Sequence, residues 1–140
     1  MNVLLDTNVV SEATRPRADP RVAEWLKSLA DRQTFISVIT VAELKRGVAL
    51  MPSGRRRSDL ADWVQVELVE RYGDRLLALT AQIADVWGQL TADLQRAGTP
   101  MPTLDGFIAA TALAHSLTVA TRNVRDFERA GVTVFNPWNS

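Results

Sequence analysis

The stretch VLLDTN at residues 3–8 decides the fold. Three consecutive aliphatic residues predict a short strand that is buried on both faces, as in a parallel sheet. An aspartate ends this run, and two small polar residues follow it directly. Asp6 therefore either begins a helix as its N-cap or presents a negative charge at the end of the strand.

The bulk composition indicates one globular domain over residues 1–140. Hydrophobic residues make up 46% of the chain and charged residues 23%, a balance typical of proteins with their own core. The absence of cysteine excludes disulfides and thiolate metal sites. Because no leader pattern or membrane-spanning run is visible, we expect a cytoplasmic protein without membrane attachment. The 16 basic and 16 acidic residues argue against coating nucleic acid through net charge alone.

Strand and helix patterns alternate along the rest of the chain. Strands are predicted at 34–38, 76–79, 117–121 and 132–135, and helices at 20–29, from Thr40, over 58–72, from Thr80 and from Thr103. No Asn-Gly hairpin signal separates the strands. This order favours an α/β fold in which a central, mainly parallel sheet is flanked by helices.

Three carboxylates are predicted at strand ends or helix starts. Asp6 follows the first strand, Glu43 falls in the first turn of the helix expected from Thr40, and Asp105 falls in the first turn of the helix expected from Thr103. In a parallel sheet, the edge at the carboxyl ends of the strands could bring them together. Clustered carboxylates repel one another unless a cation or protons intervene. An all-oxygen donor set suits Mg²⁺ or Mn²⁺ better than zinc, and such an ion can activate water against a phosphodiester.

Each acid also has an ordinary structural explanation. Asp6 is a favoured N-cap residue, and Glu43 could complete a capping box with Thr40. Asp105 suits the positive end of a helix dipole. Spacing alone does not decide between capping and metal binding.

Four segments are more informative when they are taken in order. They are LDTN at 5–8, SVITVAEL at 37–44, TLDGFIAATA at 103–112, and VATRN at 119–123 with Asp126-Phe127 after it. This ordered set resembles the PIN-domain ribonucleases, in particular the VapC/FitB toxins of bacterial toxin–antitoxin pairs. The closing VFNPW at 134–138 resembles the FitB-like branch. The resemblance spans Val3 to Trp138.

The resemblance implies a PIN-like sandwich and an Mg²⁺- or Mn²⁺-dependent endoribonuclease toxin that a cognate antitoxin neutralises. It implies that an acidic pocket binds the metal and hydrolyses RNA, and that the protein forms a homodimer or a higher assembly with the antitoxin. By motif, the catalytic and metal-binding acids are Asp6, Glu43 and Asp105, and the supporting polar residues are Thr7, Asn8 and Thr121.

The fourth acidic position departs from the family pattern. Asn123 stands where many relatives carry aspartate, and Asp126 follows three residues later. If this segment makes a helical turn, the two side chains share a face, and either could complete the metal site. The departure leaves a second function open, a PIN-like RNA- or protein-binding module with a weakened active site. Haloacid-dehalogenase-like phosphatases also place an aspartate after the first strand, but Asn8 replaces their second aspartate.

Basic residues near these motifs are predicted to contact RNA phosphates. They are Lys45 and Arg46 close to Glu43, the run Arg55-Arg56-Arg57, and Arg15, Arg17 and Arg21 as an extension. A solvated loop between helices explains the arginine run at least as well.

Overall fold

The computed structural model describes all 140 residues and places five strands in one sheet. The strands are β1 (Val3–Leu5), β2 (Thr34–Ser37), β3 (Leu76–Leu77), β4 (Thr118–Ala120) and β5 (Val134–Phe135). Their order is β3-β2-β1-β4-β5, and every neighbouring pair is parallel. The predicted α/β fold with a parallel sheet is confirmed.

β1 occupies the centre of the sheet, and the chain order reverses around it. β2 and β3 extend the sheet on one side, whereas β4 and β5 extend it on the other. Such a reversal opens a crevice beyond the carboxyl ends of the strands, where ligands bind in open parallel sheets. Asp6 and Thr121 are the first residues after β1 and β4. The topology therefore delivers two polar side chains to the same crevice.

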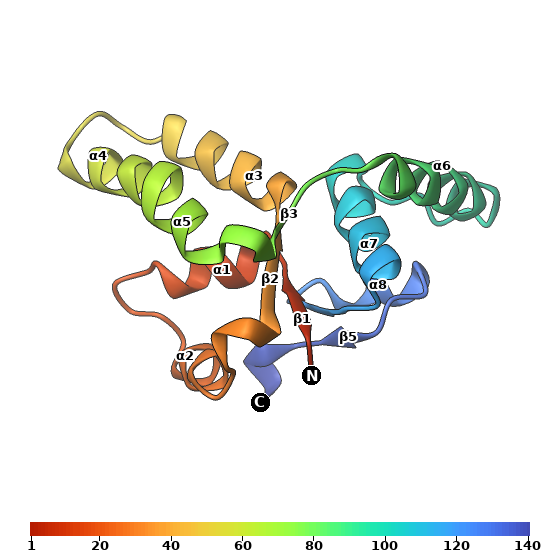
Figure 1. Cartoon of the computed structure of the whole chain (residues 1–140), viewed down its shortest axis with the longest axis horizontal. Helices are drawn as coiled ribbons and strands as arrows, with labels where there is room; N and C mark the ends of the chain where they lie inside the picture. Colours follow the sequence, from red (N-terminus) through yellow and green to blue (C-terminus); the bar gives the residue numbers. More distant parts are fainter.

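Helices cover both faces of the sheet (Figure 1). One side carries α1 (Thr7–Ala13), α2 (Pro20–Lys27), α3 (Val38–Ala49), α4 (Arg55–Asp62) and α5 (Val69–Tyr72), and the other carries α6 (Ala81–Arg96), α7 (Thr103–His115) and α8 (Val124–Arg129). Val3 and Leu5 enter the core cluster that includes residues of α1 and α2, whereas Leu4 enters the cluster with α7 and α8. This alternation explains why the whole of β1 is aliphatic. No helix combines the length and apolarity needed to cross a membrane.

Several strands are shorter than predicted because their partners end. β3 pairs only with Ile36 and Ser37, the last two residues of β2, so residues 78–79 find no neighbour in the sheet. β5 likewise pairs with Val119 and Ala120 only. The helix predicted over 20–29 ends at Lys27. Thr103 is the first residue of α7 rather than its N-cap, a position that Pro102 takes.

The helix that carries Glu43 begins earlier than predicted. Ser37 is its N-cap, and the Ser37 hydroxyl accepts a hydrogen bond from the Ile39 N–H at 3.0 Å. α3 therefore starts at Val38, and Glu43 lies in its second turn. The predicted first-turn position and the capping box with Thr40 are both wrong, because the serine at the end of β2 already caps the helix. Glu43 is thus available for contacts outside its own helix.

The arginine run is helical rather than a loop. Arg55–Arg57 form the first turn of α4, so the helix predicted over 58–72 starts three residues earlier. Between α4 and α5 the helix takes a π-helical pattern over Trp63–Leu68. α5 ends at Tyr72, the predicted last residue, and Gly73 follows with φ of +49°.

Candidate active site

Asp6 is the most deeply buried acid of the crevice, with only 4% of its surface exposed. Its Oδ1 accepts the Thr7 N–H at 2.8 Å, which caps α1, and its Oδ2 accepts the Thr121 hydroxyl at 2.7 Å. Burial raises the pKa of Asp6, the charge of Glu43 raises it further, and the hydrogen bonds from Thr121 and Thr7 oppose the rise. Asp6 therefore takes both roles that the sequence allowed: its Oδ1 caps α1, and its carboxylate lies at the end of β1 in the crevice.

Thr121 organises the polar side chains around Asp6. Its Oγ1 accepts from the Asn123 N–H at 2.9 Å and from Asn8 Nδ2 at 3.3 Å while it donates to Asp6. Asn8 in turn accepts the Arg122 N–H on its Oδ1 at 3.3 Å. Thr121 is fully buried, so water cannot replace its hydroxyl. These contacts lock the segment after β4 to the segment after β1.

Thr7 joins Glu43 to the same network. The Thr7 hydroxyl donates to Glu43 Oε1 at 2.7 Å and lies 3.3 Å from the Thr40 hydroxyl. Thr40 is fully buried inside α3, although the sequence suggested a capping role for it. The contact holds the carboxylate of α3 against the start of α1. It also explains why a small hydroxyl residue follows Asp6.

Asp105 brings the third carboxylate from the first turn of α7. Burial is the largest cause that raises the pKa of Asp105 to about 6, followed by the charges of Asp6, Glu43 and Asp126. A hydrogen bond from Asn123 opposes this rise. The four acids come from four separate segments, and the raised pKa of Asp105 reports that they share one electrostatic field.

The fourth position forms the helical turn that the sequence allowed. α8 begins at Val124, with Asn123 immediately before it and Asp126 in its first turn. Asn123 Nδ2 lies 3.2 Å from Asp126 Oδ2 and 3.4 Å from Asp105 Oδ2. In this structure the amide nitrogen, rather than the carbonyl oxygen, faces both carboxylates.

The acids open into a cleft of about 320 Å³ that has no hydrophobic lining residue. Its lining residues are Asp6, Thr7, Asn8, Ser11, Glu43 and Asp105. Ser11 was not predicted as a site residue, although it lies four residues after Thr7 and therefore on the same face of α1. Asn123 and Asp126 contact Asp105 or each other without lining the cleft directly.

The donor set of the cleft fits a hard divalent cation. No group of three or more acids is arranged so that together they hold a metal ion. Mg²⁺ does not require such a group, because it binds through one or two carboxylates and keeps several waters or substrate oxygens. The mutual repulsion that helps raise the pKa of Asp105 is the kind that a bound cation relieves.

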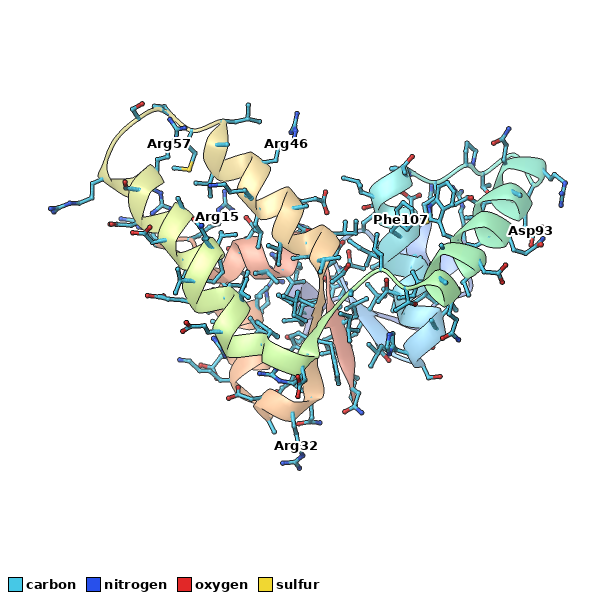
Figure 2. The ribbon with its side chains drawn as sticks, turned by 45° about the horizontal axis from the view of Figure 1, so that its top comes forward. Arg15, Arg32, Arg46, Arg57, Asp93 and Phe107 are labelled. Atoms are coloured by element: carbon cyan, nitrogen blue, oxygen red, sulfur yellow. The ribbon has the colours of Figure 1, made fainter.

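The predicted RNA-binding residues do not gather in one region. Arg56 lines an amphipathic groove that adjoins the acidic cleft and shares Thr7, Ser11 and Glu43 with it, and Arg15 lines the same groove. Other basic residues of this group lie farther away: Lys45 and Arg57 line a separate hollow between α3 and α4, and Arg46 and Arg55 are exposed outside both. Figure 2 shows Arg46 and Arg57 at the far end of α3 and Arg15 nearer to α1.

Comparisons with known proteins agree with this geometry. Residues 3–132 match the family model described as PIN domain. The chain is 42% identical over 137 residues to Toxin FitB of Neisseria gonorrhoeae, which covers 98% of this chain and 99% of FitB. It is 37% identical over 136 residues to VapC ribonuclease Y4jK of Sinorhizobium fredii, with 97% of each covered. The crystal structure of FitAcB from Neisseria gonorrhoeae superposes with a TM-score of 0.93 at 41% identity, covering 99% of both chains.

Proposed function

Because the chain belongs to the PIN-domain family, as its motifs suggested, we propose that it is a metal-dependent endoribonuclease toxin of the FitB/VapC type. It hydrolyses RNA phosphodiester bonds in the cytoplasm. One observation carries the proposal: hydrogen bonds across the fold gather Asp6 and Glu43 beside Asp105 in a cleft lined by polar side chains alone.

The residues of the cleft have distinct roles in this reaction. Asp6 and Asp105, with Glu43 beside them, would hold Mg²⁺ or Mn²⁺. The bound ion would supply positive charge for the phosphodiester and lower the pKa of a water molecule. Thr7 and Thr121 orient the carboxylates without neutralising them. Since protons and cations compete for the same oxygens, metal binding weakens as the pH falls through the pKa of Asp105.

The experiment is cleavage of single-stranded RNA by the purified protein with Mg²⁺ or Mn²⁺. We expect products with either ion, none in chelator, and none from Asp6→Asn or Asp105→Asn. Asp85→Asn, an exposed acid on α6, is the matched control and should cleave normally. Undiminished cleavage in verified metal-free buffer, or by the Asp6→Asn variant, would reject the proposal.

Asn123 favours one alternative, a PIN-like RNA- or protein-binding module with a weakened active site. Its amide bridges Asp105 and Asp126, which partly satisfies both carboxylates without a cation. This alternative predicts that the protein retains RNA in the same assay but releases no products at any metal concentration.

We propose further that a cognate antitoxin occupies the amphipathic groove and that the toxin is a homodimer, alone or within a larger complex. The groove contains Arg56, which forms no ion pair within the chain, beside Leu60 and Trp63, so it suits a peptide with acidic and apolar side chains. Because the groove shares Glu43 with the acidic cleft, a peptide bound there would obstruct RNA.

Light scattering on the toxin with and without antitoxin measures the assembly. Inhibition of RNA cleavage by the antitoxin should disappear when Arg56 and Leu60 are both replaced by Glu.

A further inference from the structure

We propose that Arg122 binds a phosphate of the RNA strand next to the acidic cleft, and that Trp138 is the positioning residue that supports its guanidinium. This inference rests on the proposed ribonuclease function and adds a substrate contact to it. The contact lies outside the carboxylate site.

The backbone of Arg122 is fixed at the rim of the cleft. It directly follows Thr121, whose hydroxyl binds Asp6 at 2.7 Å. Its own N–H donates to Asn8 Oδ1 at 3.3 Å. Both Asp6 and Asn8 line the cleft, so the Arg122 side chain starts from a position defined by the site itself.

The guanidinium of Arg122 stacks on an aromatic ring instead of pairing with an acid. Its central carbon lies 5.0 Å from the centroid of the Trp138 ring, within the range of a cation–π contact. No hydrogen bond or ion pair within the chain involves this guanidinium, and the residue is exposed. Its N–H donors are therefore available to a ligand.

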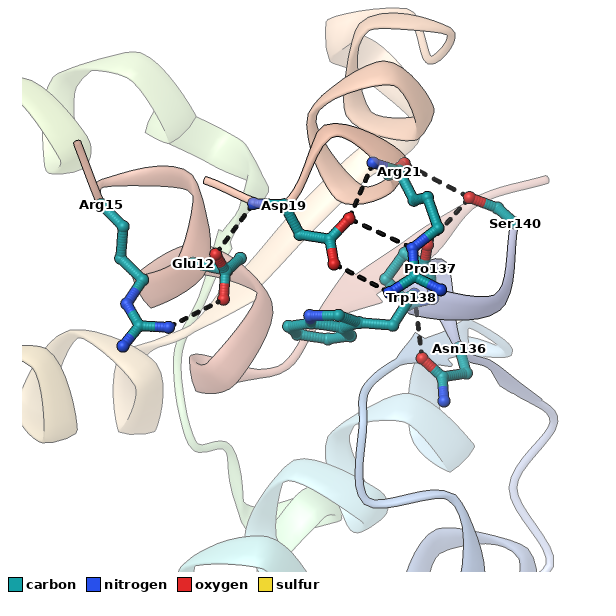
Figure 3. A network of polar contacts seen from close by, with 8 residues as sticks. All are labelled: Glu12, Arg15, Asp19, Arg21, Asn136, Pro137, Trp138 and Ser140. Atoms are coloured by element: carbon teal, nitrogen blue, oxygen red, sulfur yellow. Dashed lines mark hydrogen bonds and ion pairs between the residues drawn. The ribbon is translucent and has the colours of Figure 1, made fainter. Parts of the chain in front are cut away.

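Neighbouring arginines differ because acids two or three residues earlier in the chain already hold them (Figure 3). Arg15 pairs with Glu12 at 3.3 Å, and Arg21 pairs with Asp19 at 2.9 Å through two hydrogen bonds. The pKa of Asp19 is lowered mainly by the Arg21 hydrogen bonds, with only a small coulombic contribution from Arg122. Arg122 is therefore close to Asp19 but remains unpaired.

The C-terminal turn holds the Trp138 ring in place. Trp138 is 5% exposed and belongs to the core cluster that contains Val3 and Leu5. The backbone N–H of Trp138 donates to Asn136 Oδ1 at 3.0 Å, which caps the turn. Ser140 then ties the turn to α2 by donating to the Arg21 carbonyl at 3.3 Å. The ring is therefore a rigid support, and an ordered guanidinium loses less entropy when it binds.

An RNA phosphate is the ligand that matches these features. The cleft is acidic and the chain has no net charge, so the carboxylates alone repel the substrate. A guanidinium presents a planar fork that binds phosphate oxygens in pairs. Since its backbone borders the cleft, the Arg122 side chain would hold the strand against that repulsion. Arg122 thus contributes to substrate binding more than to the chemical step.

The first test compares Arg122→Ala, Arg122→Lys and Arg129→Ala, an exposed arginine at the far end of α8. Arg122→Ala should raise KM about tenfold or more and change kcat less than about twofold, as expected when a charged hydrogen-bonding contact is lost. The slope of log affinity against log salt should fall by about 0.7 for single-stranded RNA. Arg122→Lys should recover the salt slope and part of the KM, and Arg129→Ala should match wild type.

The second test is a double-mutant cycle with Trp138→Leu, or with Trp138→Met if the leucine variant fails a thermal melt, because neither side chain keeps an aromatic face. Replacing the ring should raise KM when Arg122 is present and leave KM unchanged in the Arg122→Ala background. A purely structural role for the ring would instead affect both backgrounds equally, and that result overturns the positioning role.

RNA binding by an Asp6→Asn background separates this inference from the proposed ribonuclease function. If the wild type cleaves no RNA, the proposed function fails, while fluorescence anisotropy with a labelled RNA still reports on Arg122. Equal RNA affinity with and without the Arg122 side chain overturns the inference. The inference is also overturned if Arg122→Ala loses antitoxin binding but keeps its RNA affinity.

Discussion

Replacing Asp105 by Asn is expected to abolish cleavage and at the same time to stabilise the metal-free protein at neutral pH. The charge of Asp105 is unfavourable in the folded state because burial and three other acids oppose its ionisation. Asparagine keeps the size and one acceptor oxygen of aspartate but carries no charge. The variant therefore removes an electrostatic cost that folding does not require and that the proposed metal ion would relieve.

The magnitude follows from the pKa of Asp105, which rises from 3.8 to about 6. This rise of roughly two pH units corresponds to about 3 kcal/mol at about 1.4 kcal/mol per unit. Asp105 is only half-buried, so solvent screening reduces the figure to about 1–2 kcal/mol. Removing an acid from the first turn of α7 also loses about 0.5 kcal/mol of favourable dipole interaction. The net gain is about 1 kcal/mol, or roughly 3 °C in melting temperature.

The pH dependence has a defined sign. Because the folded-state pKa of Asp105 lies above the unfolded value, the folded state binds more protons between about pH 4 and pH 6. Its stability therefore falls as the pH rises through this window, and the full cost is present above it. The variant lacks this titration, so its advantage should be absent near pH 4 and complete above about pH 6.

Urea unfolding in chelator at pH 4, 5, 6 and 7.5 measures the effect, with Asp85→Asn as the control. Added Mg²⁺ should stabilise the wild type by mass action and leave the Asp105→Asn variant unchanged. A variant that is less stable than wild type by the same amount at every pH would refute the reasoning. Asp105 would then act as an ordinary first-turn helix residue.

Three further variants test other contacts. Thr121→Val deletes a buried hydroxyl donor and should cost about 1–3 kcal/mol of stability in urea unfolding. Recovery by Thr121→Ser would assign the loss to the hydroxyl, and an unchanged stability of Thr121→Val would contradict the prediction. Gly106→Ala places a Cβ 3.0 Å from Trp87 Nε1. Overpacking should lower the free energy of unfolding by about 1–3 kcal/mol, more than alanine usually adds in a helix. An unchanged or higher melting temperature would mean that Trp87 moves aside. Asp126→Asn should weaken metal-dependent cleavage more than Asn123→Ala does, with partial recovery at high Mg²⁺, because a carboxylate supplies charge as well as an oxygen. A metal titration with the opposite order would identify Asn123 as the ligand.

The sequence predicted the centre of the fold because that information is local. An aliphatic run with an acid at its end fixes β1, and alternating helices and strands predict a parallel sheet. The contacts of the site are not local: the Thr121–Asp6 hydrogen bond joins residues 115 positions apart. Only the order of the motifs, taken as a family resemblance, brought these residues together before the structure was known.

The errors arose where neighbouring residues offer the same local signal. Ser37 and Thr40 can each cap a helix, and the end of β2 at Ser37 decides between them. Residues 78–79 have the apolar pattern of a strand but no partner beyond Ser37 of β2. Such outcomes depend on where a neighbouring strand stops, which propensity alone does not contain.

The acids of the site have neutral hydrogen-bond donors as their partners inside the chain. None of the four ion pairs of the chain includes Asp6, Glu43, Asp105 or Asp126. Hydroxyl and amide groups orient these acids instead, so their charge stays available to a cation. An internal arginine in the cleft would bind two carboxylate oxygens at once and displace the metal. We expect an antitoxin bound in the adjoining amphipathic groove to extend such a guanidinium into the cleft past Glu43, which both hollows share, and this would inhibit the toxin reversibly.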